Sequence, residues 1–177
     1  MKEQGSNISE NSDERIAVVP ESFSIKGKFL RQCGCASILI VDDSPFNLFV
    51  LQEIFYKITS NVSDEYFESN GGEFKIDEAT NGLHAVNKVK ESMNKEWWGG
   101  YEIVFMDLNM PVMDGAAATR EIVKLQKQKI VHRSLKVIAL TAFDGPEHKS
   151  LCFSSGMAGF LNKPVAIEHI INVLQTF

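Results

Sequence analysis

The stretch Ile38-Leu39-Ile40-Val41-Asp42-Asp43, residues 38–43, places four apolar side chains directly before two carboxylates. Three later stretches also have apolar residues followed by a polar or charged one: residues 103–107, 137–141 and 160–163, which end in Asp107, Thr141 and Lys163. Apolar runs of this length, rich in Ile and Val and separated by helical patterns, are typical of buried parallel strands. Open α/β sheets bind ligands beyond the carboxyl ends of their strands. We therefore expect three carboxylates, a hydroxyl and an amine to meet at one edge of a parallel sheet.

Composition narrows the class of protein. The chain has 177 residues, 44% of them hydrophobic, which suits one ordinary domain with a buried core. Its formal net charge is −5 and its Lys and Arg residues are scattered, so we expect no nucleic-acid partner. The N-terminus lacks an apolar signal core, and no apolar run approaches the ~20 residues that cross a bilayer. We predict a soluble, cytoplasmic protein without membrane insertion.

The cysteine content also favours a cytoplasmic location. Cys33, Cys35 and Cys152 are odd in number and include one close pair, a poor framework for a secreted disulfide scaffold. A structural zinc site needs about four ligands, and no second Cys or Cys/His cluster accompanies the pair. A reducing environment is therefore expected.

The chain divides into a tail and a domain. Residues 1–36 show no sustained hydrophobic period and are predicted to be an N-terminal tail or linker, partly disordered, whose apolar residues such as Phe29 and Leu30 could dock on the domain. Residues 37–177 form the predicted domain. Polar residues and paired glycines near 59–72 indicate a surface insertion, on the side away from the strand carboxyl ends.

Helical patterns alternate with the strands. After Asp43-Ser44-Pro45 opens the first helix, we predict that Phe46, Phe49, Val50 and Ile54 form its inward stripe. Further helices are predicted from 83, 114, 146 and 167 onward, and one more strand at 74–78. Five strands alternating with five helices indicate an α/β three-layer sandwich, a parallel sheet covered on both faces.

The polar strand ends suggest metal and phosphate chemistry. Adjacent like charges at Asp42 and Asp43 are costly unless a cation neutralises them or water reaches them, and Mg²⁺ prefers oxygen ligands of this kind. An Asp-Asp pair alone is often only a helix cap, but four segments that place complementary groups on one edge favour a site. Asp107 could serve as a nucleophile that forms an acyl phosphate, with Lys163 and the Thr141 hydroxyl on the phosphoryl oxygens.

Four motifs in order carry a family resemblance: Ile38-Leu39-Ile40-Val41-Asp42-Asp43-Ser44, Met106-Asp107-Leu108-Asn109-Met110-Pro111-Val112-Met113-Asp114-Gly115, Ile138-Ala139-Leu140-Thr141-Ala142 and Gly159-Phe160-Leu161-Asn162-Lys163-Pro164. Together they resemble the receiver domain of two-component response regulators over roughly residues 37–177, most of all the receivers joined to hybrid histidine kinases. The resemblance implies a flavodoxin-like (βα)5 fold with strand order 2-1-3-4-5.

The same resemblance implies a function in a phosphorelay. A histidine kinase or a histidine-containing phosphotransfer protein would pass a phosphoryl group to Asp107, with Mg²⁺ (or Mn²⁺) on Asp42, Asp43, Asp107 and the main-chain carbonyl of Asn109. Thr141 and Lys163 would contact the phosphoryl group, and the Lys163-Pro164 bond would be cis.

It also implies a conformational switch. Thr141 and Phe160 would move together to reshape a partner-binding face, and Phe160 stands where Tyr is more frequent in the family. The same face could also mediate homodimerisation on phosphorylation.

Two other functions compete with phosphoacceptance. A pseudo-receiver would act as a binding module without phosphotransfer. An aspartyl-phosphate phosphatase of the haloacid-dehalogenase type would need a second carboxylate two residues after the nucleophile, where this chain has Asn109. We expect slow self-dephosphorylation at most, and therefore no enzyme in the usual sense.

Overall fold

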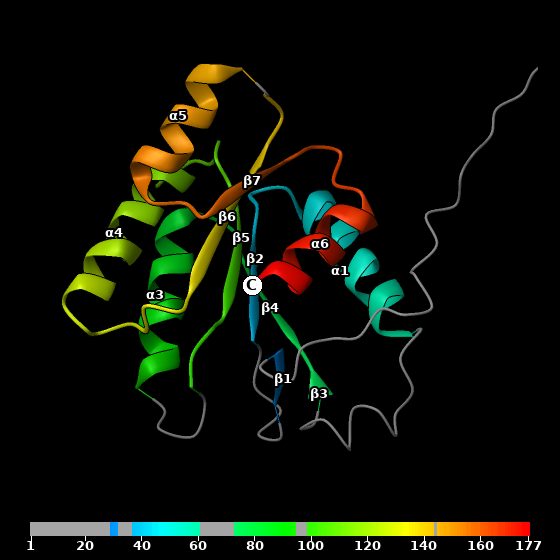
Figure 1. The fold of residues 1–177 in the computed structure, drawn as a ribbon, viewed down its shortest axis with the longest axis horizontal. Helices are drawn as coiled ribbons and strands as arrows, with labels where there is room; N and C mark the ends of the chain where they lie inside the picture. Colours follow the sequence, from blue (N-terminus) through cyan, green and yellow to red (C-terminus); the bar gives the residue numbers. More distant parts are fainter. Residues whose placement is uncertain (1–28, 32–36, 61–72, 95–98, 144) are drawn as a thin grey trace, which may run out of the picture.

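A computed structural model of the chain describes residues 29–31, 37–60, 73–94, 99–143 and 145–177. Its main sheet has five parallel strands in the order β4-β2-β5-β6-β7 (Figure 1). The strands are β2 (Ile38–Val41), β4 (Ile76–Ala79), β5 (Ile103–Asp107), β6 (Lys136–Thr141) and β7 (Gly159–Asn162). Numbered among themselves along the chain, they follow the order 2-1-3-4-5, so the predicted flavodoxin-like topology is confirmed.

Helices cover both faces of this sheet. Five are described: α1 (Pro45–Ser60), α3 (Gly82–Met93), α4 (Gly115–Lys127), α5 (Pro146–Ser155) and α6 (Ile167–Thr176). Figure 1 shows α1 and α6 on one face and α3, α4 and α5 on the other. This confirms the predicted three-layer α/β sandwich.

The core lies in two layers because successive strand side chains point to opposite faces. In β2, Ile38 and Ile40 join the cluster under α1 and α6, whereas Leu39 and Val41 join the cluster under α3 and α4. All four are fully buried. Burial on both faces explains why this strand is a continuous apolar run.

The inward face of α1 differs from the prediction. Leu48, Leu51, Phe55 and Ile58 are buried, and the predicted stripe is largely exposed: Phe46 is 71% exposed, Phe49 56% and Val50 38%, with Ile54 half-buried. The helix carries large apolar residues around most of its circumference, so its hydrophobic period does not identify one face. The sheet and α6 select the stripe that is buried.

Ordered structure begins before the predicted domain boundary. Phe29 is fully buried, and its carbonyl accepts a hydrogen bond from Ser37 Oγ at 2.7 Å. The short strand β1 (Leu30–Arg31) pairs antiparallel with β3 (Glu73–Phe74). Phe29 therefore packs on the predicted domain, as the sequence allowed, whereas the pairing of β1 was not predicted because its partner strand lies some forty positions away and leaves no local period. The remainder of the predicted tail, including Cys33 and Cys35, lies outside the described residues.

The second predicted strand and the insertion also need small revisions. The run predicted as one strand at 74–78 is divided at Lys75 between β3 and β4. Helix α1 continues through Thr59 and Ser60, and residues 61–72 of the predicted insertion lie outside the described part of the chain. Among the described helices, none combines the length and apolar character that crossing a membrane requires.

Candidate functional site

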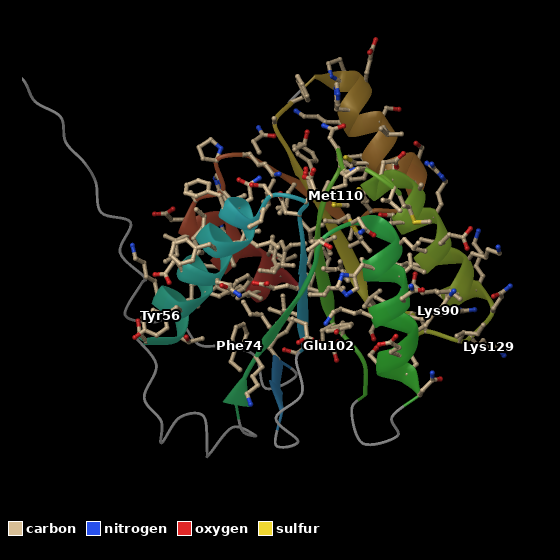
Figure 2. The ribbon with its side chains drawn as sticks, turned by 180° about the vertical axis from the view of Figure 1, so that it is seen from behind. Tyr56, Phe74, Lys90, Glu102, Met110 and Lys129 are labelled. Carbon is tan, nitrogen blue, oxygen red and sulfur yellow. The ribbon has the colours of Figure 1, made fainter. Side chains whose placement is uncertain are left out.

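The polar strand ends meet at one edge of the sheet. Asp42 follows β2, Asp107 ends β5, Thr141 ends β6 and Lys163 follows β7. The register pairs Val41 with Met106, Asp107 with Leu140, and Thr141 with Asn162, so the four side chains come from adjacent strands at the same level. Figure 2 shows Met110, in the loop that follows Asp107, toward this edge, and Glu102, just before β5, toward the other. The predicted convergence is therefore present in the structure.

Three carboxylates form a compact cluster. Asp42 is fully buried, Asp107 is 6% exposed and Asp43 is exposed, and one carboxylate oxygen of each lies within 4.8 Å of the others. Because hard divalent cations prefer carboxylate oxygens together with water, this donor set fits Mg²⁺, and exposed Asp43 leaves a side open to water.

Local structure positions Asp42. Its Oδ1 accepts hydrogen bonds from the Ser44 backbone N–H and from Asn47 Nδ2, both at 2.9 Å. These donors belong to the first turn of α1 and the residue before it, so the start of the helix holds the carboxylate in place. Sequence reasoning missed Asn47, although an amide one turn into the helix after an acidic pair is a readable signal.

Lys163 joins the two buried carboxylates. Its Nζ lies 2.6 Å from Asp42 Oδ2 and 3.0 Å from Asp107 Oδ1. The Lys163 backbone N–H donates to the Thr141 carbonyl at 2.8 Å, and the peptide bond to Pro164 is cis, as the resemblance predicted. The lysine is thus tied to β6 through its backbone and to β2 and β5 through its side chain.

Burial and pairing set the protonation of this group. Burial alone would lower the pKa of Lys163, but hydrogen bonds to Asp42 and Asp107 outweigh it, so the pKa is raised and the ammonium stays charged. Burial raises the pKa of Asp107, and hydrogen bonds from Lys163 and from the Asn109 backbone N–H offset part of that rise. The lysine therefore favours the ionised, nucleophilic form of Asp107.

The Thr141 hydroxyl is turned toward its own loop. It is buried, donates to the Phe143 carbonyl and accepts from the Phe143 N–H, each at 3.0 Å. On the adjacent strand, half-buried Phe160 contacts Phe153 of α5 edge-on, with ring centroids 6.2 Å apart, and Lys149 Nζ lies 5.1 Å from its ring centroid. Both predicted switch residues therefore contact α5 or the loop that leads to it.

The loop after β5 approaches Asp107 closely. A Cβ on Gly115 would lie 2.1 Å from the Asp107 carbonyl oxygen, so only glycine fits there. Asp114 caps α4, since its Oδ1 accepts from the Ala117 N–H at 2.6 Å. Asn109 is exposed at the rim of the site, and the metal contact of its carbonyl stays a prediction.

A cavity of about 150 Å³ lies beside the cluster. Its walls include Asp42, Phe46, Asn47, Val50 and Lys163. It connects the polar site with the exposed apolar residues of α1.

The same residues fall within a known family pattern. A model of the response regulator receiver domain matches residues 38–175. Hybrid signal transduction histidine kinase B of Dictyostelium discoideum is 33% identical over 141 residues, which are 76% of this chain and 6% of that protein. The osmosensing histidine protein kinase SLN1 of Saccharomyces cerevisiae is 31% identical over 140 residues, 79% of this chain and 10% of that protein. The chain thus spans a tenth or less of the length of these relatives.

Solved structures show the same likeness. The receiver domain of the Arabidopsis thaliana histidine kinase CKI1, complexed with Mg²⁺, is 27% identical with a TM-score of 0.63, over 85% of this chain and 95% of that one. The receiver domain of the S. cerevisiae response regulator Ssk1, crystallised with the histidine phosphotransfer protein Ypd1, gives 27% identity and a TM-score of 0.62, over 78% and 85%.

Proposed function

The chain belongs to the response regulator receiver domain family, and from that premise we propose that it accepts a phosphoryl group from a phosphohistidine onto Asp107, in a magnesium-dependent step of a two-component phosphorelay. One observation carries the proposal. The Asp107 carboxylate lies 3.0 Å from the Lys163 ammonium and within 4.8 Å of Asp42 and Asp43, at the carboxyl edge of a parallel sheet. A nucleophile, a cation and metal-binding oxygens are thus adjacent.

The proposed transfer is a direct displacement at phosphorus. An Asp107 carboxylate oxygen forms a P–O bond as the P–N bond to the donor imidazole breaks, and the imidazole nitrogen keeps the bonding electrons. Asp42, Asp43, Asp107 and the Asn109 carbonyl would hold Mg²⁺ (or Mn²⁺), which when bound supplies positive charge beside the transferring group. Lys163 moves from its contacts with the carboxylates onto a phosphoryl oxygen and neutralises it.

The contacts of Thr141 support a proposed switch. To donate to a phosphoryl oxygen, its hydroxyl must give up the hydrogen bond to the Phe143 carbonyl, which shifts the loop before α5. Phe160, on the neighbouring strand, is in contact with Phe153 and Lys149 of the same helix. We propose that these contacts rearrange together and alter the surface of α5 and β7, where a partner binds or a second copy pairs.

The proposed donor is a histidine kinase or a histidine-containing phosphotransfer protein. The similarity to Ssk1, whose receiver was crystallised with Ypd1, supports this class of partner. A cytoplasmic location and the absence of a nucleic-acid partner stay predictions from the sequence. Phosphoacceptance of this kind is stoichiometric, so we propose that the chain is not an enzyme in the turnover sense.

Acetyl phosphate provides the direct test. Intact-protein mass and a phosphate-affinity gel are measured after incubation with and without Mg²⁺, for the wild type, Asp107→Asn and Asp114→Asn. Asp114 is a matched control, because it lies in the same loop and asparagine can keep its capping role. We expect one magnesium-dependent phosphate that only Asp107→Asn abolishes. A wild-type chain that takes no label would instead support the binding module without phosphotransfer.

A further inference from the structure

Val112 adopts a backbone conformation that its side chain disfavours. It lies in the loop between β5 and α4, and its φ is 70°. The Met113 N–H donates to the Pro111 carbonyl at 2.8 Å, which makes a three-residue γ-turn with Val112 at its centre. Turns of this kind with positive φ are rare and strained, and a β-branched residue at positive φ is an outlier.

The neighbours of Val112 impose this path on the loop. On one side, the Gly82 N–H donates to the Met113 carbonyl at 3.0 Å, an approach that only glycine allows, since a Cβ there would lie 2.6 Å from the same oxygen. On the other, the Gly115 N–H donates to the Leu108 carbonyl at 3.0 Å. Backbone strain persists where surrounding contacts determine the conformation. A glycine at position 112 would adopt the same backbone path without strain, because it has no Cβ.

The Val112 side chain contributes little to the folded domain. It is 78% exposed, whereas apolar side chains of the core are buried. A large apolar residue that is both strained and exposed is explained neither by packing nor by turn geometry. Its side chain is therefore available to something that covers this loop.

Other apolar side chains are exposed at the same edge of the sheet. Phe46, 71% exposed, follows β2, and Phe143, 52% exposed, follows β6, as Val112 follows β5. A small phosphodonor such as acetyl phosphate has no surface with which to cover these side chains. A protein that brings an imidazole within bonding distance of Asp107 must cover the edge on which they lie.

We propose that Val112 is a contact residue for the phosphohistidine-bearing protein, buried when that protein docks over Asp107, and that it favours protein donors over small phosphodonors. This inference rests on the proposed function. Because Val112, Phe46 and Phe143 are apolar and exposed, a protein that covers them would remove apolar surface from water.

The test compares two donors on four proteins. Phosphorylated Ypd1 of S. cerevisiae serves as the protein donor and acetyl phosphate as the small one, with transfer to Asp107 followed on phosphate-affinity gels. The proteins are the wild type, Val112→Ala, Val112→Gly and Ile130→Ala. Ile130 is a matched control, 48% exposed beside Lys129, which Figure 2 shows beyond the end of α4 and away from Met110.

Both Val112 variants should lower kcat/KM with Ypd1 about tenfold, because each removes the methyl groups of Val112 that the docked donor would bury. Labelling by acetyl phosphate should be unchanged, and Ile130→Ala should match the wild type with both donors. Val112→Gly should also melt about 2–4 °C above Val112→Ala, the reverse of their usual order, because it alone removes the strained Cβ.

The remaining outcomes contradict the inference and separate it from the proposed function. Normal acetyl phosphate labelling with unchanged Ypd1 kinetics in both variants would mean that no donor touches Val112. A parallel fall with both donors would mean that Val112 acts on the chemistry of Asp107 and not on docking. A wild type labelled by acetyl phosphate but not by Ypd1 would also contradict the proposal that the apolar side chains at this edge bind phosphohistidine-bearing proteins. A wild type labelled by neither donor would overturn the proposed function itself.

Discussion

Replacing Lys163 by methionine removes the cation that joins two buried carboxylates. The Lys163 Nζ lies 2.6 Å from Asp42 and 3.0 Å from Asp107, and its side chain is 22% exposed, so solvent screens these contacts only partly. Removing one partner of such a buried pair costs about 3 kcal/mol or more, because the remaining charges are left uncompensated. For a chain of this size, we expect the thermal midpoint to fall by about 6–12 °C at neutral pH in the presence of a chelator.

The pH dependence of this loss has a definite sign. Burial already raises the pKa of Asp107 above its ordinary 3.8, and without Lys163 it rises further. A carboxyl group whose pKa is higher in the folded state than in the unfolded state destabilises the fold as the pH rises from its unfolded-state pKa to its folded-state pKa. The difference between the variant and the wild type should therefore be largest near neutral pH and shrink toward about pH 4. Mg²⁺ should restore more stability to the variant than to the wild type.

Lys88→Met is the matched control. Lys88 Nζ lies 3.7 Å from Asp77 Oδ2, and both side chains are about a third exposed, so this surface pair should contribute at most about 1 kcal/mol. Thermal melts of both variants across pH, with and without Mg²⁺, measure the effect. A Lys163→Met midpoint within about 2 °C of the control, or a loss independent of pH, would refute the argument from buried charge.

Three further predictions concern other parts of the fold. Burial and the hydrogen bond to Asp77 raise the pKa of Tyr101 above 10, so wild-type stability should fall by about 1.4 kcal/mol per pH unit above that value, and urea titrations of Tyr101→Phe should show a flatter dependence. Gly115→Ala should cost about 3 kcal/mol in urea unfolding and reduce labelling of Asp107, since the new Cβ meets a backbone oxygen at 2.1 Å; unchanged labelling and stability would contradict this. Phe29→Ala should cost about 3–5 kcal/mol because Phe29 is fully buried, and a loss below about 1 kcal/mol would mean that it does not belong to the core.

Much of the site was predictable because its signals are local. Each strand is a short apolar run, and the residue after it has the polar group, so parallel strands alone place Asp42, Asp107, Thr141 and Lys163 at one edge. The order of those strands followed only from the family resemblance, since hydrophobic periodicity says nothing about which strands are neighbours.

Other features were mispredicted or missed because they depend on distant contacts. The buried stripe of α1 was wrong, since the helix has apolar residues on several faces and only the sheet selects one. The pairing of β1 with β3 joins segments with no shared pattern. The hydrogen bond from Asn47 to Asp42 is a different case, because it joins residues only five positions apart and the amide that follows the acidic pair was a local signal that the prediction did not use.

The sequence by itself determined which chemical groups are present and that they end the strands of a parallel sheet. Only the tertiary structure decided how they meet: Lys163 lies between Asp42 and Asp107, although it is 121 positions from Asp42 along the chain. The same holds for the loop of Val112, where the Gly82 N–H of α3 donates to the Met113 carbonyl next to the residue with positive φ. Local patterns encode secondary structure and burial, whereas contacts between remote segments form only when the whole core has assembled.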